Sequence, residues 1–248
     1  KIFIIIGHNN DIYIKKWYNY FCRGGKNMKE YRAFEILGPI MVGPSSSHTA
    51  GACKIARVAA RICPENYKKV IFYLHGSFAM TYKGHGTDRA LLGGILGFKT
   101  YDDRIRDAFK IADSKKINYE FVATDLGEDF HPNTVKISFV YEDHEEYVIG
   151  SSIGGGNMII VDINGIQVEF DGTHPTLLFR YNEQKGIISE ISSILYKNDY
   201  NIESINTIKD DLTEIVNLTI ELDQNLSIDL VKKLTTNSKF LMAKYVEV

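Results

Sequence analysis

The segment from Gly43 to Gly51 brings three serines, a histidine and a threonine together within nine residues. Hydroxyls and free backbone N–H groups are typical carboxylate ligands. The run from Ala52 to Ile62 that follows predicts a helix, whose N-terminus carries partial positive charge. The alternative is a Ser-rich loop that only caps this helix, because Ser and Thr are also preferred N-cap residues. The candidate ligands for a small anion are Ser45, Ser46, Ser47, His48 and Thr49.

A second polar segment runs from Gly76 to Asp88 and follows a short apolar run at 70–75, which predicts a strand. Residues that follow a strand are a common place for functional sites in mixed α/β folds. His85 lies between two glycines, so its imidazole could approach a ligand closely, and Asp88 could fix its tautomer. The alternative is a solvated loop histidine. Further binding candidates in this segment are Ser77, Lys83 and Thr87.

The strands and helices predicted around these two segments indicate an α+β domain from 28 to 156. Apolar and β-branched runs predict strands at 33–36, 70–75, 119–123, 135–141 and 146–150, and helical periodicity predicts helices at 50–61 and 88–96. Both polar segments are expected to be loops. Alternation on either side of Asn164-Gly165 predicts a hairpin over 158–168, which we expect to link two domains within 157–172.

After 173 the pattern changes to strand, helix, strand, strand, helix, strand, in the order βαββαβ. The predicted strands are 176–181, 202–208, 214–222 and 240–246, and the predicted helices are 186–197 and 228–234. We therefore expect a second, ferredoxin-like domain over 173–248.

Two more fragments complete the set of polar motifs: the run from Thr124 to Thr134, with His131 at its centre, and Ser151-Ser152-Ile153-Gly154-Gly155-Gly156. In the order GPSSSHTAG, GSFAMTYKGHGTD, DFHPNT and SIGGG, the fragments resemble the beta subunit of the iron–sulfur-dependent L-serine dehydratases, also called L-serine ammonia-lyases. The resemblance covers nearly everything from Met28 onward. Tyr82 departs from it, because a small residue is usual there, and its bulk could narrow the pocket.

The resemblance implies a lyase that converts L-serine to pyruvate and ammonia without pyridoxal phosphate. His85 would take the α-proton, supported by Asp88, and the hydroxyls of the first segment would hold the carboxylate or amine. His131 is implied as a further binding residue. Lys83 could in principle form a Schiff base, but no phosphate cradle surrounds it, and we interpret it as solvated or anion-steering.

The three cysteines, Cys22, Cys53 and Cys63, form no CxxC pair and no recognisable metal-binding array. Because iron–sulfur clusters are normally held by thiolates, no metal site is expected on this chain. The resemblance implies a separate alpha subunit that ligates a 4Fe-4S cluster and shares the active site.

The C-terminal domain resembles an ACT domain, a small module that binds amino acids and pairs with other copies of itself. The resemblance implies regulatory ligand residues in its first strand-to-helix loop: Asn182, Lys185, Gly186 and Ile187. The alternative is a module that only self-associates. A second function also stays open, a non-catalytic serine-sensing regulatory module that ends in an ACT domain.

Composition limits the other classes of partner. Net charge is −2 and the basic residues are scattered, which argues against a nucleic-acid partner held by bulk electrostatics. No apolar run reaches membrane-spanning length, and we predict a cytoplasmic protein without a membrane partner. Residues 1–27 differ from the rest, and Arg23-Gly24-Gly25 could be encoded by a ribosome-binding sequence. We therefore expect Met28 to be the natural start and 1–27 to be a non-native or upstream-translated extension.

Overall fold

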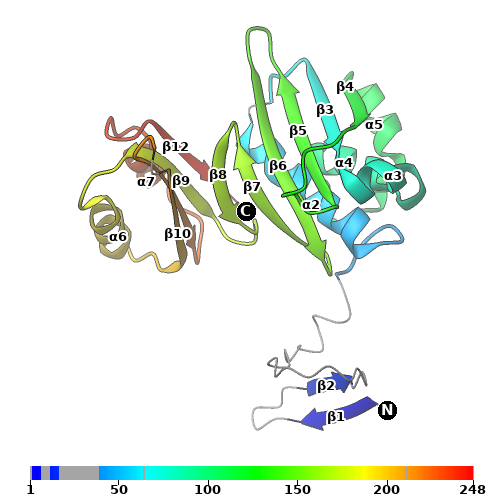
Figure 1. The fold of residues 1–248 in the computed structure, drawn as a ribbon, viewed down its shortest axis with the longest axis horizontal. Helices are drawn as coiled ribbons and strands as arrows, with labels where there is room; N and C mark the ends of the chain where they lie inside the picture. Colours follow the sequence, from blue (N-terminus) through cyan, green and yellow to red (C-terminus); the bar gives the residue numbers. More distant parts are fainter. Residues whose placement is uncertain (1, 7–11, 17–38, 64, 211, 248) are drawn as a thin grey trace.

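The computed structural model describes residues 2–6, 12–16, 39–63, 65–210 and 212–247. Near the N-terminus, β1 (Ile2–Ile6) and β2 (Ile12–Lys16) pair antiparallel. The expected start at Met28 and the strand predicted over 33–36 lie outside the described residues. The rest of the described chain forms two larger sheets, each with helices packed against one face (Figure 1).

The first sheet has six strands in the order β4-β3-β5-β6-β7-β8. Neighbouring strands are antiparallel except β3 and β4, which run parallel. Every second residue of β3 is buried, as expected for a strand with helices on one face. The bounds are β3 (Lys69–Leu74), β4 (Asn118–Ala123), β5 (Thr134–Val140), β6 (Glu145–Gly154), β7 (Asn157–Ile163) and β8 (Ile166–Phe170).

Helices cover one face of this sheet (Figure 1). Apolar residues recur along α2 at helical spacing and are buried against the strands, from Ala52 and Ile55 to Ala59 and Ile62. This apolar stripe is the reason that the helix forms and stays on the sheet. The bounds are η1 (Ser46–Gly51, a π-helical turn), α2 (Ala52–Ile62), α3 (Gly76–His85), α4 (Thr87–Ile95), η2 (Asp103–Asp107) and α5 (Ala108–Ser114).

The prediction of a loop over Gly76–Asp88 was wrong, because most of that segment is the helix α3. Phe78 is fully buried beneath it and supplies the apolar anchor. The helix ends where Gly86 adopts a left-handed conformation, with φ 68°, and α4 begins at the next residue. The first polar segment was also expected to be a loop, and from Ser46 it is the π-helical turn η1.

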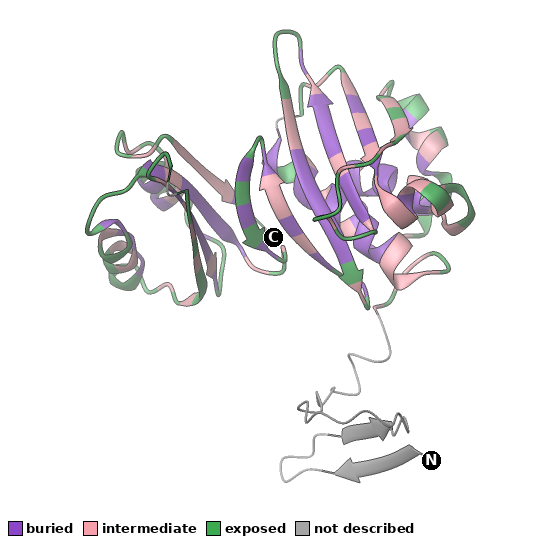
Figure 2. Ribbon diagram, in the orientation of Figure 1, coloured by how far each residue is buried: buried purple, intermediate pink, exposed green. Residues whose placement is uncertain are grey.

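The hairpin predicted around Asn164-Gly165 is confirmed by β7 and β8, and both turn residues have positive φ. It is not a separate linker, because β7 pairs with β6 and the hairpin completes the first sheet. The edge strand β8 alternates between buried and exposed residues (Figure 2). The first sheet therefore extends to Phe170 rather than ending near residue 156.

The C-terminal elements follow the predicted order βαββαβ, and their four strands form an antiparallel sheet in the order β10-β11-β9-β12. A core that includes Leu177, Phe179, Ile191 and Leu218 holds the helices on one face. The bounds are β9 (Thr176–Asn182), α6 (Ile187–Lys197), β10 (Ile202–Asp210), β11 (Ile215–Leu222), α7 (Ile228–Thr235) and β12 (Met242–Val246).

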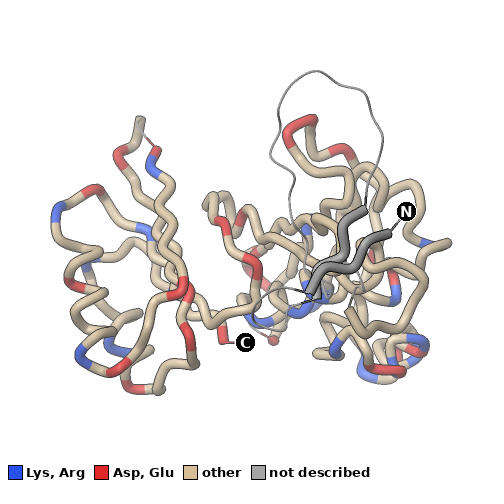
Figure 3. Tube along the Cα trace, turned by 90° about the horizontal axis from the view of Figure 1, so that it is seen from below, with Lys and Arg blue, Asp and Glu red and all other residues tan. Residues whose placement is uncertain are grey.

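The two sheets are joined by buried residues as well as by the chain. Leu178 and Val246 of the second sheet belong to the buried cluster of the first. At the rim, the ammonium of Lys244 lies 2.9 Å from the carboxylate of Glu146. Basic and acidic residues are scattered over both halves of the molecule (Figure 3). Among the described helices, none combines the length and apolarity needed to cross a bilayer.

Close packing of α2 on α4 depends on Gly94. A Cβ at this position would lie 2.4 Å from the carbonyl oxygen of Cys53 and 2.6 Å from the Cβ of Ala56. Because those atoms belong to the backbone and core of α2, only glycine allows the two helices to approach this closely.

We predict that Gly94→Ala lowers the free energy of unfolding by about 1–3 kcal/mol, the usual cost of overpacking a core. Denaturant titration of both proteins would measure this difference. The matched control is Gly84→Ala, whose Cβ would meet no atom within 4 Å, so its stability should be unchanged or up to about 1 kcal/mol greater. Equal stability of the Gly94→Ala variant and the unmodified protein would contradict the packing argument.

Candidate active site

The first polar segment forms a wide turn whose geometry is set by Ser45. Its side-chain oxygen accepts the backbone N–H of His48 at 3.2 Å, and its carbonyl accepts the N–H of Thr49 at 2.8 Å. Gly43 precedes this turn with φ 125°, and a Cβ there would lie 2.4 Å from a side-chain atom of Thr49. Ser45 therefore caps the turn η1 and fixes the position of His48. It does not cap the helix over Ala52–Ile62, as the alternative interpretation expected, because the N-cap of α2 is Gly51, which makes no side-chain cap hydrogen bond.

Both ring nitrogens of His48 lie near serine hydroxyls. Nε2 is 2.9 Å from Oγ of Ser77, at the beginning of α3, and Nδ1 is 3.4 Å from Oγ of Ser45. The edge of the ring also contacts Phe78, with centroids 5.4 Å apart. These contacts connect the first polar segment to the second across 29 residues of sequence.

A third segment holds the beginning of α3 in place. The carbonyl of Pro132 accepts the N–H groups of Ser77, at 2.8 Å, and of Phe78, at 3.4 Å. Gly76 makes this possible, because a Cβ there would lie 2.7 Å from that carbonyl oxygen. Next to Pro132, Asn133 has a buried side-chain oxygen without a hydrogen-bond partner among the described residues. Sequence reasoning missed Asn133, although it lies within the motif DFHPNT.

His85 lies against His48 at the other end of α3. The two rings are 4.8 Å apart between centroids and tilted by 33°, and the hydroxyl of Thr49 donates to the carbonyl of His85 at 3.2 Å. Nδ1 of His85 is buried and has no hydrogen-bond partner in the described part of the chain. A buried polar atom without a partner is costly, so this nitrogen is available to a bound ligand.

Burial lowers the pKa of His48 below its ordinary value of 6.5, and the neighbouring His85 lowers it further because two positive rings repel. The neutral form of His48 therefore predominates at pH 7. As a neutral ring it has one donor and one acceptor, which suits its position between two hydroxyls.

The expected hydrogen bond between His85 and Asp88 does not form through Nδ1, which has no partner among the residues that the structure describes. Gly86 turns the chain between them, and the carboxylate of Asp88 accepts the N–H of Arg89 at 2.8 Å. Burial raises the pKa of Asp88 above its ordinary value. Beside it, Thr87 is fully buried and its hydroxyl has no partner among the described residues.

The other candidates lie around this cluster. Ser46 and Ser47 are half-buried in η1. Lys83 is exposed, with its ammonium 5.6 Å from the ring centroid of Tyr82. His131 is also exposed, and its Nδ1 accepts the N–H of Asn133 at 3.1 Å. The structure thus brings together Ser45, His48, Thr49, Ser77 and His85, and it leaves Lys83 and His131 outside this hydrogen-bonded cluster.

Known protein families and proteins with similar sequences contain the same region. Residues 33–162 match the family described as "Serine dehydratase beta chain", a span that includes η1, α3 and the Pro132 loop. The chain belongs to the serine dehydratase beta chain family. The L-serine dehydratase beta chain of Peptoniphilus asaccharolyticus is 59% identical over 222 residues, which are 89% of this chain and all of that protein.

More distant members of the serine dehydratases match smaller parts of the chain. The probable L-serine dehydratase beta chain of Bacillus subtilis is 41% identical over 84% of this chain and 94% of its own length. L-serine dehydratase 2 of Escherichia coli is 38% identical, over only 26% of this chain and 15% of its own length. The resemblance seen in the four motifs is therefore confirmed for the beta-chain family.

The family suggests an iron–sulfur cluster, but the residues described for this beta chain do not fit one. Cys53 and Cys63 are buried at opposite ends of α2, and burial raises the pKa of each thiol to about 12. The thiol of Cys53 already donates to the carbonyl of Phe98. The described residues hold no group of three His, Cys, Asp or Glu side chains that could bind a metal ion.

The strand-to-helix loop of the C-terminal domain borders a cavity of about 340 Å³. Gly186 begins α6 with φ 93°, and both Gly186 and Ile187 line the cavity together with Tyr181 and Thr207. Asn182 and Lys185 are exposed and are not among its lining residues. The family match ends at residue 162, so the ACT assignment stays a prediction.

We predict that His48 titrates below pH 6.5 and that His85→Gln moves this titration upward, because a repelling charge is removed while burial remains. NMR titration of the histidine ring protons would measure the pKa.

A lowered pKa in the folded state also means that the contribution of His48 to stability is complete above about pH 6.5 and is lost as the pH falls through the folded-state pKa. The exposed residue Met80 gives the control Met80→Ala, which should leave the pKa unchanged. An equal pKa in the His85→Gln protein would rule out the repulsion.

Proposed function

We propose that this chain is the beta subunit of an L-serine dehydratase, which eliminates water from L-serine to give pyruvate and ammonia. The main support is the cluster of His48, Ser77 and His85, assembled from the motifs of the beta-chain family. The dehydratase names of the relatives at 59% and 41% identity support the same reaction.

The first step assigned to this chain is binding of the substrate carboxylate. The hydroxyls of Ser46 and Ser47 lie in η1 beside the hydrogen-bonded Ser45, where they and Ser77 can donate to an anion. The N-terminal turns of η1 and α3 add positive potential. The N–H groups of Ser77 and Phe78 already donate to Pro132, so the hydroxyls are the donors left for the anion. In this arrangement His48 positions Ser77 and Ser45, and its neutral ring adds no competing charge.

The second step is removal of the α-proton, which we assign to His85. Its Nδ1 is buried and has no hydrogen-bond partner within the described ranges, so a substrate C–H can approach an open nitrogen rather than one already hydrogen-bonded. The Cα proton goes to the imidazole, the electron pair of the Cα–H bond forms the Cα–Cβ double bond, and the Cβ–O bond breaks. The imidazolium then gives the same proton to the leaving hydroxide, which departs as water and leaves His85 neutral again. The resulting aminoacrylate becomes an imine, which water hydrolyses to pyruvate and ammonia. Asp88 can act only indirectly, because no hydrogen bond joins it to Nδ1.

A partner subunit is inferred because the described part of this chain has no residues suited to ligating an iron–sulfur cluster. Its buried thiols do not fit a cluster, so we propose that an alpha subunit ligates the 4Fe-4S cluster and completes the active site. The names "beta chain" of the relatives support a second subunit. A cytoplasmic location remains part of the same proposal.

We also propose that residues 173–248 form an ACT domain that pairs with another copy of itself. The order βαββαβ and the antiparallel sheet support the assignment. Strand β10 is an edge strand, and Ile205 on it is 44% exposed; an edge with unpaired backbone groups favours association with another sheet.

The test of catalysis is anaerobic turnover of L-serine by this chain mixed with a cysteine-bearing alpha subunit and a reconstituted cluster. We expect pyruvate only from the mixture. The variant His85→Ala should lose at least about 100-fold in kcat, the usual contribution of a positioned base, while L-serine still binds. The exposed histidine His144, in the turn between β5 and β6, gives the control His144→Ala with normal turnover.

Two results would contradict the proposal. Full activity of the His85→Ala mixture would remove His85 from the role of base. Binding of L-serine without turnover in any mixture would favour the serine-sensing regulatory module instead.

For self-association, we predict that the full chain sediments as a dimer at micromolar concentration and that Ile205→Asp shifts it toward the monomer, because a charge is placed on the proposed edge. Analytical ultracentrifugation would measure both. Leu212→Asp changes an exposed residue outside the strand and serves as the control. A monomer at all concentrations would refute pairing of the chain by itself.

A further inference from the structure

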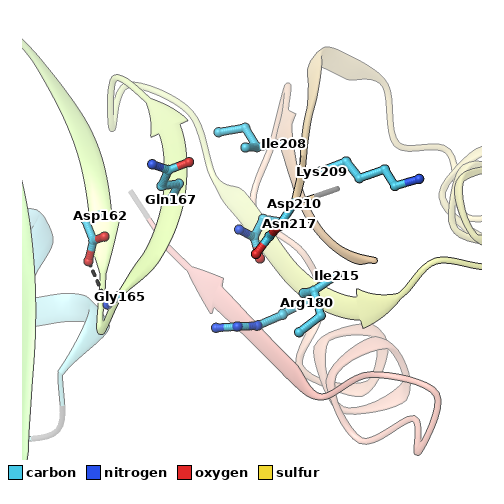
Figure 4. Close-up of a pocket in the computed structure, with 9 residues that line it drawn as sticks. All are labelled: Asp162, Gly165, Gln167, Arg180, Ile208, Lys209, Asp210, Ile215 and Asn217. Carbon is cyan, nitrogen blue, oxygen red and sulfur yellow. Dashed lines mark hydrogen bonds between the residues drawn. The ribbon is translucent and has the colours of Figure 1, made fainter. Parts of the chain in front are cut away.

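A polar cavity of about 500 Å³ lies between the β7–β8 turn of the first sheet and the helix-free face of the second (Figure 4). Asp162 and Gln167 line it from the first sheet, and Arg180, Asp210 and Asn217 line it from the second. It is separate from the candidate active site and from the cavity beside Gly186, which have different residues around them apart from the shared Lys209.

The polar character of this face follows from strand alternation. On β9, Phe179 and Tyr181 point to the core under the helices, so Arg180 between them points to the opposite side. On β11, Asn217 lies between the core residues Val216 and Leu218 and is the cross-strand neighbour of Arg180. Two long polar side chains are thus placed next to each other on the face that meets the first sheet.

Two of these polar groups have no close partner. The guanidinium of Arg180 makes no hydrogen bond and no ion pair within 4 Å to another residue in the described part of the chain. Its charge does act on the carboxylate of Asp210, whose pKa is lowered by hydrogen bonds to Thr213 and Leu212 and also by Arg180. The side-chain oxygen of Asn217 is buried and also has no partner among the described residues. Buried polar groups are normally satisfied, by protein, water or ligand. The buried amide oxygen of Asn217, next to the half-buried guanidinium of Arg180, therefore marks a recognition site.

The opposite charge is present in the same cavity. The half-buried carboxylate of Asp162 accepts the N–H of Gly165 at 2.8 Å, and that of Asp210 accepts the N–H of Leu212 at 2.9 Å. Asp210 also accepts hydrogen bonds from Thr213, and Asp162 accepts one from the side chain of Tyr147. Because a carboxylate has about four acceptor positions, each still has room for a further donor. The other cation, Lys209, pairs with Glu183, and its ammonium points away from the cavity in Figure 4. One guanidinium and two carboxylates therefore face a single small space.

We propose that this cavity binds a small zwitterionic α-amino acid. The guanidinium of Arg180 would hold the carboxylate through two parallel hydrogen bonds, the arrangement for which arginine is best suited. The ammonium would donate to the side-chain oxygen of Asn217 and to the carboxylate of Asp162. Because the ligand would touch both sheets, its binding stabilises one arrangement of the two domains. This inference does not depend on the proposed reaction.

The test uses equilibrium dialysis of the full chain with L-serine, L-alanine and glycine in turn, together with hydrogen exchange to locate the bound ligand. We expect one of them to protect the backbone at 162–167 and at 208–217. Arg180→Gln should weaken this binding about tenfold or more, because a charge-assisted bidentate contact is lost. Ser77→Ala should leave it unchanged, which separates this site from the candidate active site.

The matched control is Arg106→Gln, which removes the charge of an exposed arginine far from the cavity. If Arg180→Gln fails to fold, as judged by thermal unfolding, Arg180→Lys replaces it and should still weaken binding, because lysine cannot make the bidentate contact. The proposal is overturned if none of the three amino acids binds outside the Ser77-dependent site, if the Arg180 variants bind normally, or if protection is confined to 183–189.

Discussion

The carbonyl group of Pro132 is the point on which the candidate site depends. It accepts two N–H groups from the beginning of α3, groups that have no partner within the helix itself. The contact holds Ser77 opposite His48 at one end of the helix and, one helix length away, His85 beside the same imidazole. Gly76 is required because any side chain would collide with this carbonyl. Thus one backbone contact fixes the positions of groups contributed by three separate segments.

Sequence alone predicted the parts of the fold that are set by local patterns. The short apolar run of β3, the Asn164-Gly165 turn and the order βαββαβ were all recognisable, because each is set by neighbouring residues. The loop predicted over 76–88 was wrong because α3 depends on the distant Pro132 and on burial of Phe78. Likewise the pairing of His48 with Ser77 spans 29 residues and has no local signal. The expected support of His85 by Asp88 relied on closeness in sequence, which the left-handed turn at Gly86 removes.

The two neighbouring histidines differ in what remains open to a ligand. His48 is enclosed by serines and has a lowered pKa, so it serves as a fixed neutral bridge. His85 keeps a buried nitrogen to which no described residue is hydrogen-bonded. A similar difference exists in the second sheet, where Lys209 forms an ion pair with Glu183, while Arg180 forms none within 4 Å in the part of the chain that the structure describes. In both places the group that already has partners, His48 or Lys209, holds its neighbours in position. The other group, His85 or Arg180, can form new hydrogen bonds with a ligand, and these would contribute to the binding free energy.

The two cysteines of α2 have a practical consequence. Only the thiolate reacts with alkylating reagents, and burial holds the pKa of both thiols at about 12, so neither is reactive while the helix is packed. Cys53 lies in the first turn of α2 and Cys63 just after its last, against different neighbours. The alkylation rate of each thiol in the native protein therefore reports the opening of one end of the helix, and a difference between the two rates would reveal which end detaches from the sheet first.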